Sequence, residues 1–366
     1  MKEDRSSDPF PRRKTRRILV GDVSIGNGSP ISVQSMTNTD TRDIQATLSQ
    51  IKSLEAEGCQ IVRLAVIDRE AAEAIKILRK ETSVPLIADI HFDHRLALAS
   101  LDAGVDALRI NPGTIGSRKK VREIVKEAKN RAAPIRIGVN SGSVEKRLIT
   151  KYGGPTPQAM VESVLGHVRL LEDMDFFRIK ISLKASDVLR TLESYRMLAG
   201  KVDYPFHTGI TEAGGRLKGT VKSSAGLALL IREGLADTIR VSLTAPPEEE
   251  VRVAFALLSS LGIRNDRPNL ISCPTCGRCQ VDLLRISEEV ERRLFSVKGN
   301  VTVAVMGCAV NGPGEAREAD IGVACGRGSG LIFKKGRVIG RVKEEDIVRV
   351  LVHEVLVLTG QEKGNR

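Results

Sequence analysis

The chain has 366 residues, 41% of them hydrophobic, which is enough for a sizeable core and for a barrel with an added domain. It has no apolar run of about 18 residues and no apolar stretch behind its charged first 17 residues, so we expect a soluble, cytoplasmic protein without a membrane partner. Its net charge of +12 favours an anionic partner, and with 3% aromatic residues and no Trp a phosphorylated small molecule is a better candidate than nucleic acid.

Apolar, β-branched segments alternate with helix-like segments over residues 1–265. Strands are expected at 31–37, 61–66, 85–91, 107–113, 134–140, 176–183, 205–212 and 237–244. The intervening segments begin with Asp, Ser or Pro and end near Gly, as capped helices do. This pattern predicts an α/β fold, a (β/α)8 TIM-type barrel, with a hairpin over 14–30 at its bottom. A doubly wound sheet is the alternative, disfavoured because no Gly-rich dinucleotide fingerprint follows the first strand.

Polar side chains recur at alternate positions in these strands, with Ile, Val or Leu between them. Residues two apart in a strand face the same side, so the apolar set should face the helices and the polar set the lumen. The polar set comprises Arg63, Asp89, His91, Arg109, Asn111, Arg136, Asn140, Lys180, Ser182, Lys184, Arg240 and Ser242, with His207, Thr208, Thr211 and Glu212 at the end of the seventh strand.

Six lumen residues are cations, namely Arg63, Arg109, Arg136, Lys180, Lys184 and Arg240. Barrel lumens are normally filled by Val, Ile and Leu, and an unpaired buried charge costs several kcal/mol. The alternative interpretation is a structural one, in which the cations form internal salt bridges with Asp89 and Glu212, but two carboxylates cannot pair six cations. The lumen is therefore predicted to bind a ligand with two or more negative charges, whose phosphate oxygens suit the fork of Arg.

A polar linker, GIRNDRPNLIS, leads into a second domain over 266–366, where a small α/β fold is expected. Four of the chain's six cysteines cluster late in the sequence: Cys273, Cys276, Cys279 and Cys308. In a cytoplasmic chain such clustering indicates metal rather than disulfides. By spacing alone these four thiolates could hold zinc or an iron–sulfur cluster. Cys59 is interpreted as a core residue.

Several long motifs decide between these interpretations. The segments VQSMTNTDT, ADIHF, RINPG, IRIGVNSGS, HTGITEAG, DTIRVSLT, CPTCGR and GCAVNGPGEA, in this order, resemble the bacterial-type (E)-4-hydroxy-3-methylbut-2-enyl diphosphate synthases from about residue 14 to 360. The resemblance implies a [4Fe–4S] cluster held by Cys273, Cys276, Cys308 and Glu315, with Cys279 outside the set. Ser141 and Ser143 of IRIGVNSGS join the substrate-binding residues on the same ground.

The resemblance also implies a reaction. The substrate would be 2-C-methyl-D-erythritol 2,4-cyclodiphosphate, an intermediate of non-mevalonate isoprenoid biosynthesis. Two electrons and two protons open its ring and release one hydroxyl as water, giving (E)-4-hydroxy-3-methylbut-2-enyl diphosphate. Flavodoxin or ferredoxin would supply the electrons, and Glu212 and His91 are the candidate proton donors or orienting groups, beside Glu315 at the iron.

Topology predicts how such an enzyme assembles. Each barrel helix descends from the catalytic mouth, so the eighth, near 247–261, ends at the bottom after roughly 22 Å. Cys273 follows only about ten residues later. A head-to-tail homodimer, in which one chain's cluster domain covers the other chain's mouth, is the simplest arrangement and is also implied by the resemblance. A zinc-stabilised barrel for phosphorylated sugars and a nucleic-acid-binding module remain the alternatives.

Overall fold

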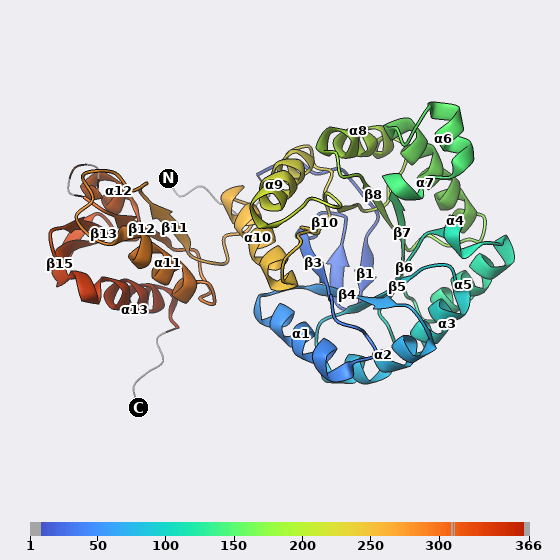
Figure 1. Ribbon diagram of the computed structural model, residues 1–366, viewed down its shortest axis with the longest axis horizontal. Coiled ribbons are helices and arrows are strands. Elements are labelled where there is room, and N and C mark those ends of the chain that lie inside the picture. The colour runs from blue at the N-terminus through green and yellow to red at the C-terminus, as the bar shows by residue number, and fades with distance from the viewer. Residues whose placement is uncertain (1–8, 309, 311, 362–366) are drawn as a thin grey trace. The chain divides into compact units, whose positions relative to one another are not determined.

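The computed structural model describes residues 9–308, 310 and 312–361. The chain divides into two compact units, Met1–Leu257 and Leu258–Arg366, each with its own sheet (Figure 1). No helix in the described part of the chain is long and apolar enough to cross a membrane.

The larger unit is a parallel barrel. Its strand order is β8-β7-β6-β5-β4-β3-β10-β9, every neighbouring pair is parallel, and a parallel bridge between Ile181 and Phe206 joins the two ends. The strands are β3 (Ser32–Met36), β4 (Ile61–Val66), β5 (Leu86–Ile90), β6 (Ala107–Ile110), β7 (Ile135–Asn140), β8 (Ile179–Lys184), β9 (His207–Thr208) and β10 (Thr238–Ile239). The predicted TIM-type barrel is confirmed and the doubly wound sheet is excluded.

Helices surround the barrel and follow its strands (Figure 1). They are α1 (Ile44–Ala56), α2 (Arg69–Glu81), α3 (His94–Asp102), α5 (Arg118–Asn130), α7 (Pro157–Glu172), α8 (Val188–Ala199), α9 (Arg216–Arg232) and α10 (Pro247–Ser260), with the shorter α4 (Pro112–Ile115), α6 (Lys146–Tyr152) and the 3-10 turn η1 (Ser141–Ser143). Asp43, Asp68, Asp93 and Asp187 each accept a hydrogen bond from a backbone N–H in the first turn of a helix. These caps fix where the chain turns from strand to helix at the mouth.

An antiparallel hairpin of β1 (Ile18–Val20) and β2 (Val23–Ile25) lies at the other end. Its apolar residues pack on Ile61, Ile87 and Ala107, which stand at the beginnings of β4, β5 and β6. The hairpin therefore closes the barrel's bottom, as expected, and leaves the carboxyl ends of the strands as the mouth.

The smaller unit is the expected small α/β domain. Its sheet has the order β11-β12-β13-β14-β15, in which β11, β12 and β13 are parallel and the last two pairs antiparallel. The elements are β11 (Asn269–Ser272), α11 (Leu283–Leu294), β12 (Thr302–Met306), α12 (Gly312–Glu318), β13 (Ile321–Gly326), β14 (Ser329–Lys334), β15 (Arg337–Lys343), the 3-10 turn η2 (Glu344–Asp346) and α13 (Ile347–Thr359). Strand β11 falls in the segment interpreted as a linker.

Side-chain size distinguishes the two faces of this sheet. Branched residues such as Val303 and Val323 pack against α11 and α13. The other face presents Ala304 and Ala324 to α12. A β-carbon on Gly322 would lie 2.8 Å from Ala316, so the small residues let α12 approach the sheet closely.

Candidate active site

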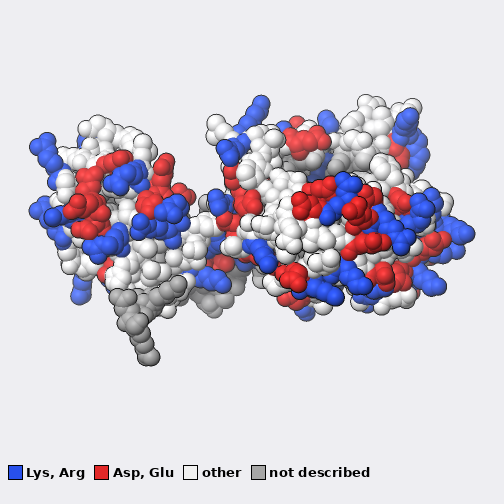
Figure 2. All heavy atoms as spheres, turned by 60° about the horizontal axis from the view of Figure 1, so that its bottom comes forward, with Lys and Arg blue, Asp and Glu red and all other residues white. Residues whose placement is uncertain are grey.

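Surface charge on the barrel is mixed. In Figure 2, basic and acidic side chains are interspersed over the wall of the larger unit. Many form exposed ion pairs, such as Arg118–Asp173 at 3.0 Å and Arg216–Glu249 at 2.9 Å. Such pairs contribute little to stability and give this wall no continuous basic surface.

The buried cations of the lumen are different. Cross-strand register places Asp89, Arg109, Arg136 and Lys180 side by side on β5, β6, β7 and β8, in one row across the barrel. Neighbouring strands lie about 4.8 Å apart, so the charged groups of this row are close together. All four side chains are buried. The structure thus brings together the residues that alternation predicted for the lumen.

Asp89 is the carboxylate at the end of this row. Its Oδ1 lies 3.0 Å from Arg109 Nη1 and its Oδ2 lies 3.5 Å from Arg63 Nε. Burial alone would raise the pKa of Asp89, but these two guanidinium groups outweigh it and lower the pKa to about 2. Asp89 is therefore ionised and compensates part of the charge of two arginines.

The rest of the row has no such compensation. Lys180 Nζ, Arg136 Nε and Nη1, and Arg109 Nε are buried without a hydrogen-bond partner among the described residues. Burial and then the neighbouring Arg136 lower the pKa of Lys180 well below its ordinary value. Buried donors of this kind are costly unless a ligand satisfies them. Their convergence indicates an anion-binding lumen.

Two histidines contribute neutral rings. His207 is fully buried, and its Nε2 lies 3.2 Å from Lys184 Nζ. Burial, and then the charge of Lys184, lower the pKa of His207 well below its ordinary value. His91 is half-exposed, with Nε2 2.6 Å from Arg109 Nη1, and burial lowers its pKa against the opposing effect of Asp89. Both rings are neutral at pH 7, so His91 accepts a hydrogen bond from Arg109.

The structure reveals a carboxylate partner of the lumen cation Arg240 that sequence reasoning missed. Glu250, on α10, is buried and approaches Arg240, with Oε2 3.3 Å from the arginine Nε. It also accepts hydrogen bonds from Ser35 Oγ at 3.1 Å and from Leu243 N at 3.0 Å. The interpretation that only Asp89 and Glu212 could compensate the cations was therefore wrong. Nothing local marks Glu250, since it follows two other glutamates at the start of a helix.

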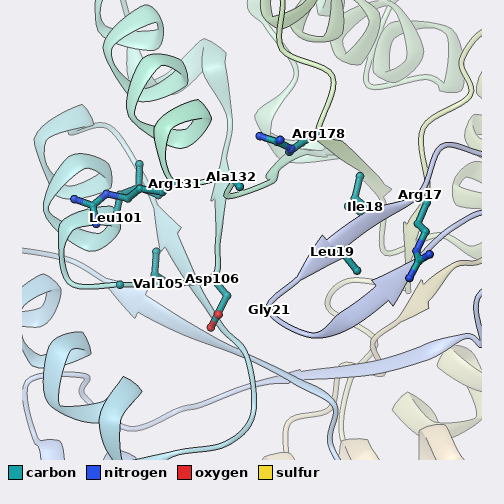
Figure 3. Close-up of a pocket in the computed structure, with 11 residues that line it drawn as sticks. Arg17, Ile18, Leu19, Gly21, Leu101, Val105, Asp106, Arg131, Ala132 and Arg178 are labelled. Atoms are coloured by element: carbon teal, nitrogen blue, oxygen red, sulfur yellow. The ribbon is translucent and has the colours of Figure 1, made fainter.

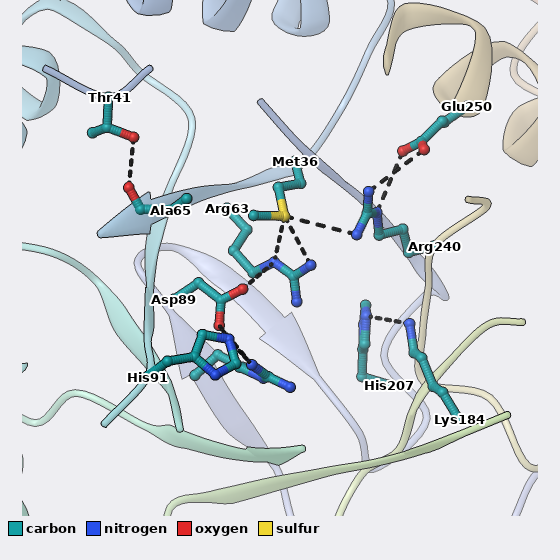
Figure 4. A network of polar contacts seen from close by, with 11 residues as sticks. Met36, Thr41, Arg63, Ala65, Asp89, His91, Lys184, His207, Arg240 and Glu250 are labelled. Carbon is teal, nitrogen blue, oxygen red and sulfur yellow. Dashed lines mark hydrogen bonds and ion pairs between the residues drawn. The ribbon is translucent and has the colours of Figure 1, made fainter. Parts of the chain in front are cut away.

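Met36 was also missed. Figure 4 shows its sulfur between Arg63 and Arg240, 2.9 Å from Arg63 Nη2 and 3.8 Å from Arg240 Nη1. Gly138, on β7, leaves room for another lumen cation, because a β-carbon there would lie 2.8 Å from Arg109 Nε. Gln34, on β3, is buried with both polar ends of its amide unpartnered among the described residues. Strand alternation could have placed all three in the lumen.

The remaining predicted residues occupy more varied positions. The Asn111 side chain caps α4 by accepting from Gly113 N at 3.0 Å, and Ser143 Oγ bonds the backbone of Asn140 at 3.0 Å. These two side chains support the local fold at the mouth. Glu212 is exposed after β9 and has a φ of +52°, so it takes no part in the buried ion pairs. The other predicted residues are buried or half-buried, namely Asn140, Ser141, Ser182, Thr208, Thr211 and Ser242.

The cysteines of the smaller unit follow two adjacent parallel strands. Cys273 comes directly after β11, and Cys308 comes two residues after β12. Gly307 N donates to Cys273 Sγ at 3.3 Å, so the two cysteine loops touch. Glu315 stands in the first turn of α12, and Cys276 is exposed.

These donors do not converge on one point. In the described part of the chain, no three His, Cys, Asp or Glu side chains could hold a single metal ion. Thiolates are the ligands that iron–sulfur clusters use, and the loops that carry Cys273 and Cys308 touch.

The other three cysteines differ from these candidate ligands. Cys279 Sγ lies 2.6 Å from where a β-carbon on Gly307 would be, so it packs against the loop that carries Cys308. Cys59 and Cys325 are buried, and burial raises the pKa of each thiol to about 12. The interpretation of Cys59 as a core residue is confirmed.

A cavity of about 530 Å³ lies at the bottom of the barrel, at the end opposite the mouth (Figure 3). It is formed by β1 and by the loops that lead into β6, β7 and β8, with Arg17, Arg131 and Arg178 around it. None of the residues predicted for the site lines it. This cavity is therefore separate from the predicted site.

Fold and site together define a TIM-barrel protein with buried cations in its lumen and a separate cysteine-bearing unit. Residues 15–255 match the family model described as the GcpE TIM-barrel domain, and residues 269–356 match that of the GcpE protein C-terminal domain. The chain belongs to the GcpE family, whose members are iron–sulfur enzymes, as its motifs predicted.

Its relatives include proteins named 4-hydroxy-3-methylbut-2-en-1-yl diphosphate synthase (flavodoxin). That of Geobacter sulfurreducens is 57% identical over 94% of this chain and 98% of its own length. That of Clostridium perfringens is 56% identical over 93% of this chain and 98% of its own length. Among solved structures, an N-acetylneuraminic acid synthetase from Leptospira borgpetersenii matches with a TM-score of 0.50 at 11% identity, over 69% of this chain and 90% of that one, which supports the barrel fold alone.

Proposed function

We propose that this protein is an oxidoreductase that converts 2-C-methyl-D-erythritol 2,4-cyclodiphosphate into (E)-4-hydroxy-3-methylbut-2-enyl diphosphate in isoprenoid biosynthesis. The names of its relatives support the product and the use of flavodoxin. The observation that carries the proposal is the group of buried donors without partners on Arg109, Arg136 and Lys180. A cyclic diphosphate supplies about two negative charges and several acceptor oxygens to such a group.

In this proposal the barrel, residues 1–265, binds the substrate. Arg136 and Lys180 hold phosphate oxygens at the end of the row away from Asp89, while Arg63 and Arg109 are held in place by Asp89. Because the bound anion brings charge into the row, it raises the pKa of Lys180 and keeps its ammonium protonated. The binding residues are those predicted from the strands, with Asn140, Ser141 and Ser143 at the mouth.

Proton supply falls to groups at the mouth. His91 has a neutral ring that accepts from Arg109, so it orients that guanidinium instead of delivering a proton at neutral pH. Glu212 is exposed directly after β9 and is free of the buried ion pairs. We assign Glu212 the exchange of a proton with the leaving oxygen and His91 an orienting role.

The second domain, residues 266–366 in this proposal, holds a [4Fe–4S] cluster through Cys273, Cys276, Cys308 and Glu315. The bound cluster supplies the electrons that no side chain can provide. The donor set fits, since the loops that carry Cys273 and Cys308 touch through Gly307. Cys279 packs beside this set without belonging to it.

We further propose that the enzyme works as a head-to-tail homodimer in the cytoplasm, where reducing conditions keep its cysteines out of disulfides. The rim of the barrel mouth supports the dimer. Large apolar side chains are exposed just after β4 and β5, namely Ile67 and Phe92, and in the first two turns of α8 and α9, namely Leu189, Leu217 and Val221. Such a rim around a charged lumen favours cover by a protein surface, and a second chain's cluster domain is that cover in this proposal.

Anaerobic purification and a turnover assay test the proposed function. We expect a brown protein with a broad visible absorption band, about four irons per chain, and conversion of the cyclic diphosphate when reduced methyl viologen is supplied. A colourless protein that contains zinc would exclude it. An iron-loaded protein that leaves the cyclic diphosphate unchanged would contradict the proposed substrate but not the proposed cofactor.

A further inference from the structure

The segment from β13 to β15 has an unusual charge. Residues 321–343 contain six cations and no carboxylate, so they carry +6 of the chain's net +12. The cations are Arg327, Lys334, Lys335, Arg337, Arg341 and Lys343. The anion-binding lumen explains none of this charge, because the segment lies in the smaller unit.

Most of these cations lack a partner. Lys334 pairs with Glu354 at 2.6 Å and Lys343 pairs with Glu345 at 3.7 Å. The other four form no ion pair with any described residue. In Figure 2, basic side chains stand along the left-hand border of the smaller unit, on the side where Figure 1 labels β15. Four basic side chains of this segment are therefore available to pair with an acidic partner.

One face of β14 and β15 is also uncovered. Helix α12 packs over Ala324 and Phe333, on β13 and β14. Leu331 lies opposite Arg341, and Val338 lies opposite Phe333, so pleating places them on the α12 side of the sheet. Leu331 is 37% and Val338 55% exposed, which shows that α12 does not cover them. Leu331 and Val338 therefore form an apolar strip, which is bordered by Arg341 and Lys343.

This face borders the edge of the sheet that carries the candidate ligands. Strand β15 runs antiparallel to β14 and therefore parallel to β11, β12 and β13. The carboxyl ends of these four strands share one edge, where Cys273 follows β11, Cys308 follows β12, Arg327 follows β13 and Lys343 ends β15. Three strand spacings of about 4.8 Å separate β12 from β15.

We propose that the uncovered face of β14 and β15, with Leu331 and Val338 at its centre and Arg327, Arg341 and Lys343 around it, is the docking surface for an electron-carrier protein with an acidic face. The proposal rests on the proposed function, which requires such a carrier to deliver electrons at the ligand-bearing edge. A small apolar centre with a charged rim is the usual anatomy of a transient interface. Charge complementarity then speeds the encounter more than it tightens the complex.

Two other interpretations of the same face are weaker. Charges on an edge strand guard it against pairing with another strand, but Arg327 and Lys335 lie in turns and not on β15. A second copy of the chain would present its barrel mouth, whose lumen is lined by cations that repel this face. Both interpretations become outcomes of the test.

The test is a pair of matched charge reversals in the full-length holoenzyme. R341E/K343E changes the proposed surface, and R292E/R349E makes the same change on α11 and α13, which cover the opposite face of the sheet. Each variant is assayed with purified reduced flavodoxin and, separately, with reduced methyl viologen, which needs no docking surface. For R341E/K343E we expect kcat/KM for flavodoxin to fall roughly tenfold or more at low salt and the methyl viologen rate to stay unchanged. The control variant R292E/R349E should retain the wild-type rates with flavodoxin and with methyl viologen.

A second variant addresses the apolar centre. V338D should lower the rate with flavodoxin at low and at high salt. For R341E/K343E, raising the salt concentration should bring the rate with flavodoxin closer to that of the wild type. Unchanged flavodoxin rates in both variants, or equal losses with the two reductants, would overturn the proposal. So would a loss that accompanies dissociation of the dimer in size-exclusion chromatography. A wild-type enzyme that is inactive even with methyl viologen would instead contradict the proposed function.

Discussion

Lys180 illustrates, at the scale of single residues, how the site opposes the stability of the fold. Its ammonium is fully buried and has no partner among the described residues, so the unliganded barrel bears the cost of burying it. Lys180→Met should therefore raise the free energy of unfolding by about 1 kcal/mol or more. It should also weaken substrate binding roughly ten- to a hundredfold, the usual loss for a charge-assisted contact. Denaturant unfolding and calorimetry measure the two effects, with exposed Lys126→Met as the control.

The same lysine predicts a pH dependence. Its folded pKa is lowered, so between that value and the unfolded value of about 10.4 the unfolded chain binds more protons than the folded one. The stability of the unliganded protein should therefore increase with pH across this alkaline window, and Lys180→Met should reduce the slope by up to about 1.4 kcal/mol per pH unit. Urea unfolding from pH 7 to about 10 measures it. Equal slopes in both proteins would show that Lys180 is not desolvated.

Glu250 acts through another residue, since it fixes Arg240 and also accepts from Leu243 N. Glu250→Gln keeps one oxygen for Leu243 N but turns an amide toward Arg240 and Ser35, which are themselves donors. We expect the substrate KM to rise severalfold with a smaller change in kcat, and stability to fall by about 1–3 kcal/mol. Glu249→Gln, whose carboxylate pairs with Arg216 on the surface, is the matched control and should change neither. A change in kcat alone would contradict a positioning role.

At the scale of elements, most of the barrel could be predicted, because strand and helix periods differ and Asp or Ser caps mark the junctions. The lengths of the last two strands, predicted at 205–212 and 237–244, were overestimated. Only two residues each of β9 and β10 form ladders, and beyond them the backbone makes single bonds, such as Thr211 N to Ala185 O and Thr244 N to Gly214 O. Strand β11 was missed because it is an exposed edge strand, so its sequence, NLIS, lacks the alternation that burial imposes.

Strand β7 shows how an element can make room for the site. At Gly138 a β-carbon would lie 2.8 Å from Arg109 Nε and 3.2 Å from Ser182 Oγ, although the backbone there suits any residue. Gly138→Ala should displace the Arg109 guanidinium, lower stability by about 1–3 kcal/mol through overpacking, and weaken substrate binding. Gly142→Ala, in open space at η1, should leave binding unchanged. Normal substrate affinity in Gly138→Ala would show that Arg109 does not need its present position.

At the scale of the whole molecule, the candidate site was predictable as a set of lumen cations but not as a network. Alternation places Arg240 in the lumen, yet its partner Glu250 lies on a helix and bonds Ser35, 215 residues away in the chain. No periodicity encodes such a contact, because it depends on how β10 and β3 meet where the barrel closes. For the same reason the exposed position of Glu212 could not be foreseen.

Assembly provides the last prediction. If active sites are shared between two chains, each site takes its lumen cations from one chain and its cluster ligands from the other. A chain with Arg136→Ala and a chain with Cys308→Ala should each be inactive alone, since the first lacks a substrate contact and the second a cluster ligand. In a heterodimer one of the two sites then has both residues intact, so mixing the variants under conditions of subunit exchange should restore up to about half of the wild-type activity per dimer.

The control for this experiment is a mixture of two variants that affect the same half of the site, Arg136→Ala with Lys180→Met. These substitutions lie on neighbouring strands of one barrel, so every site in their heterodimer carries one of them, and mixing should give no activity beyond that of the two variants assayed separately. Exchange is verified independently by mass spectrometry of differently tagged chains. Heterodimers that form without recovering activity would show that each chain completes its own site, and the apolar rim of Phe92 and Leu217 would then have to bind some other surface.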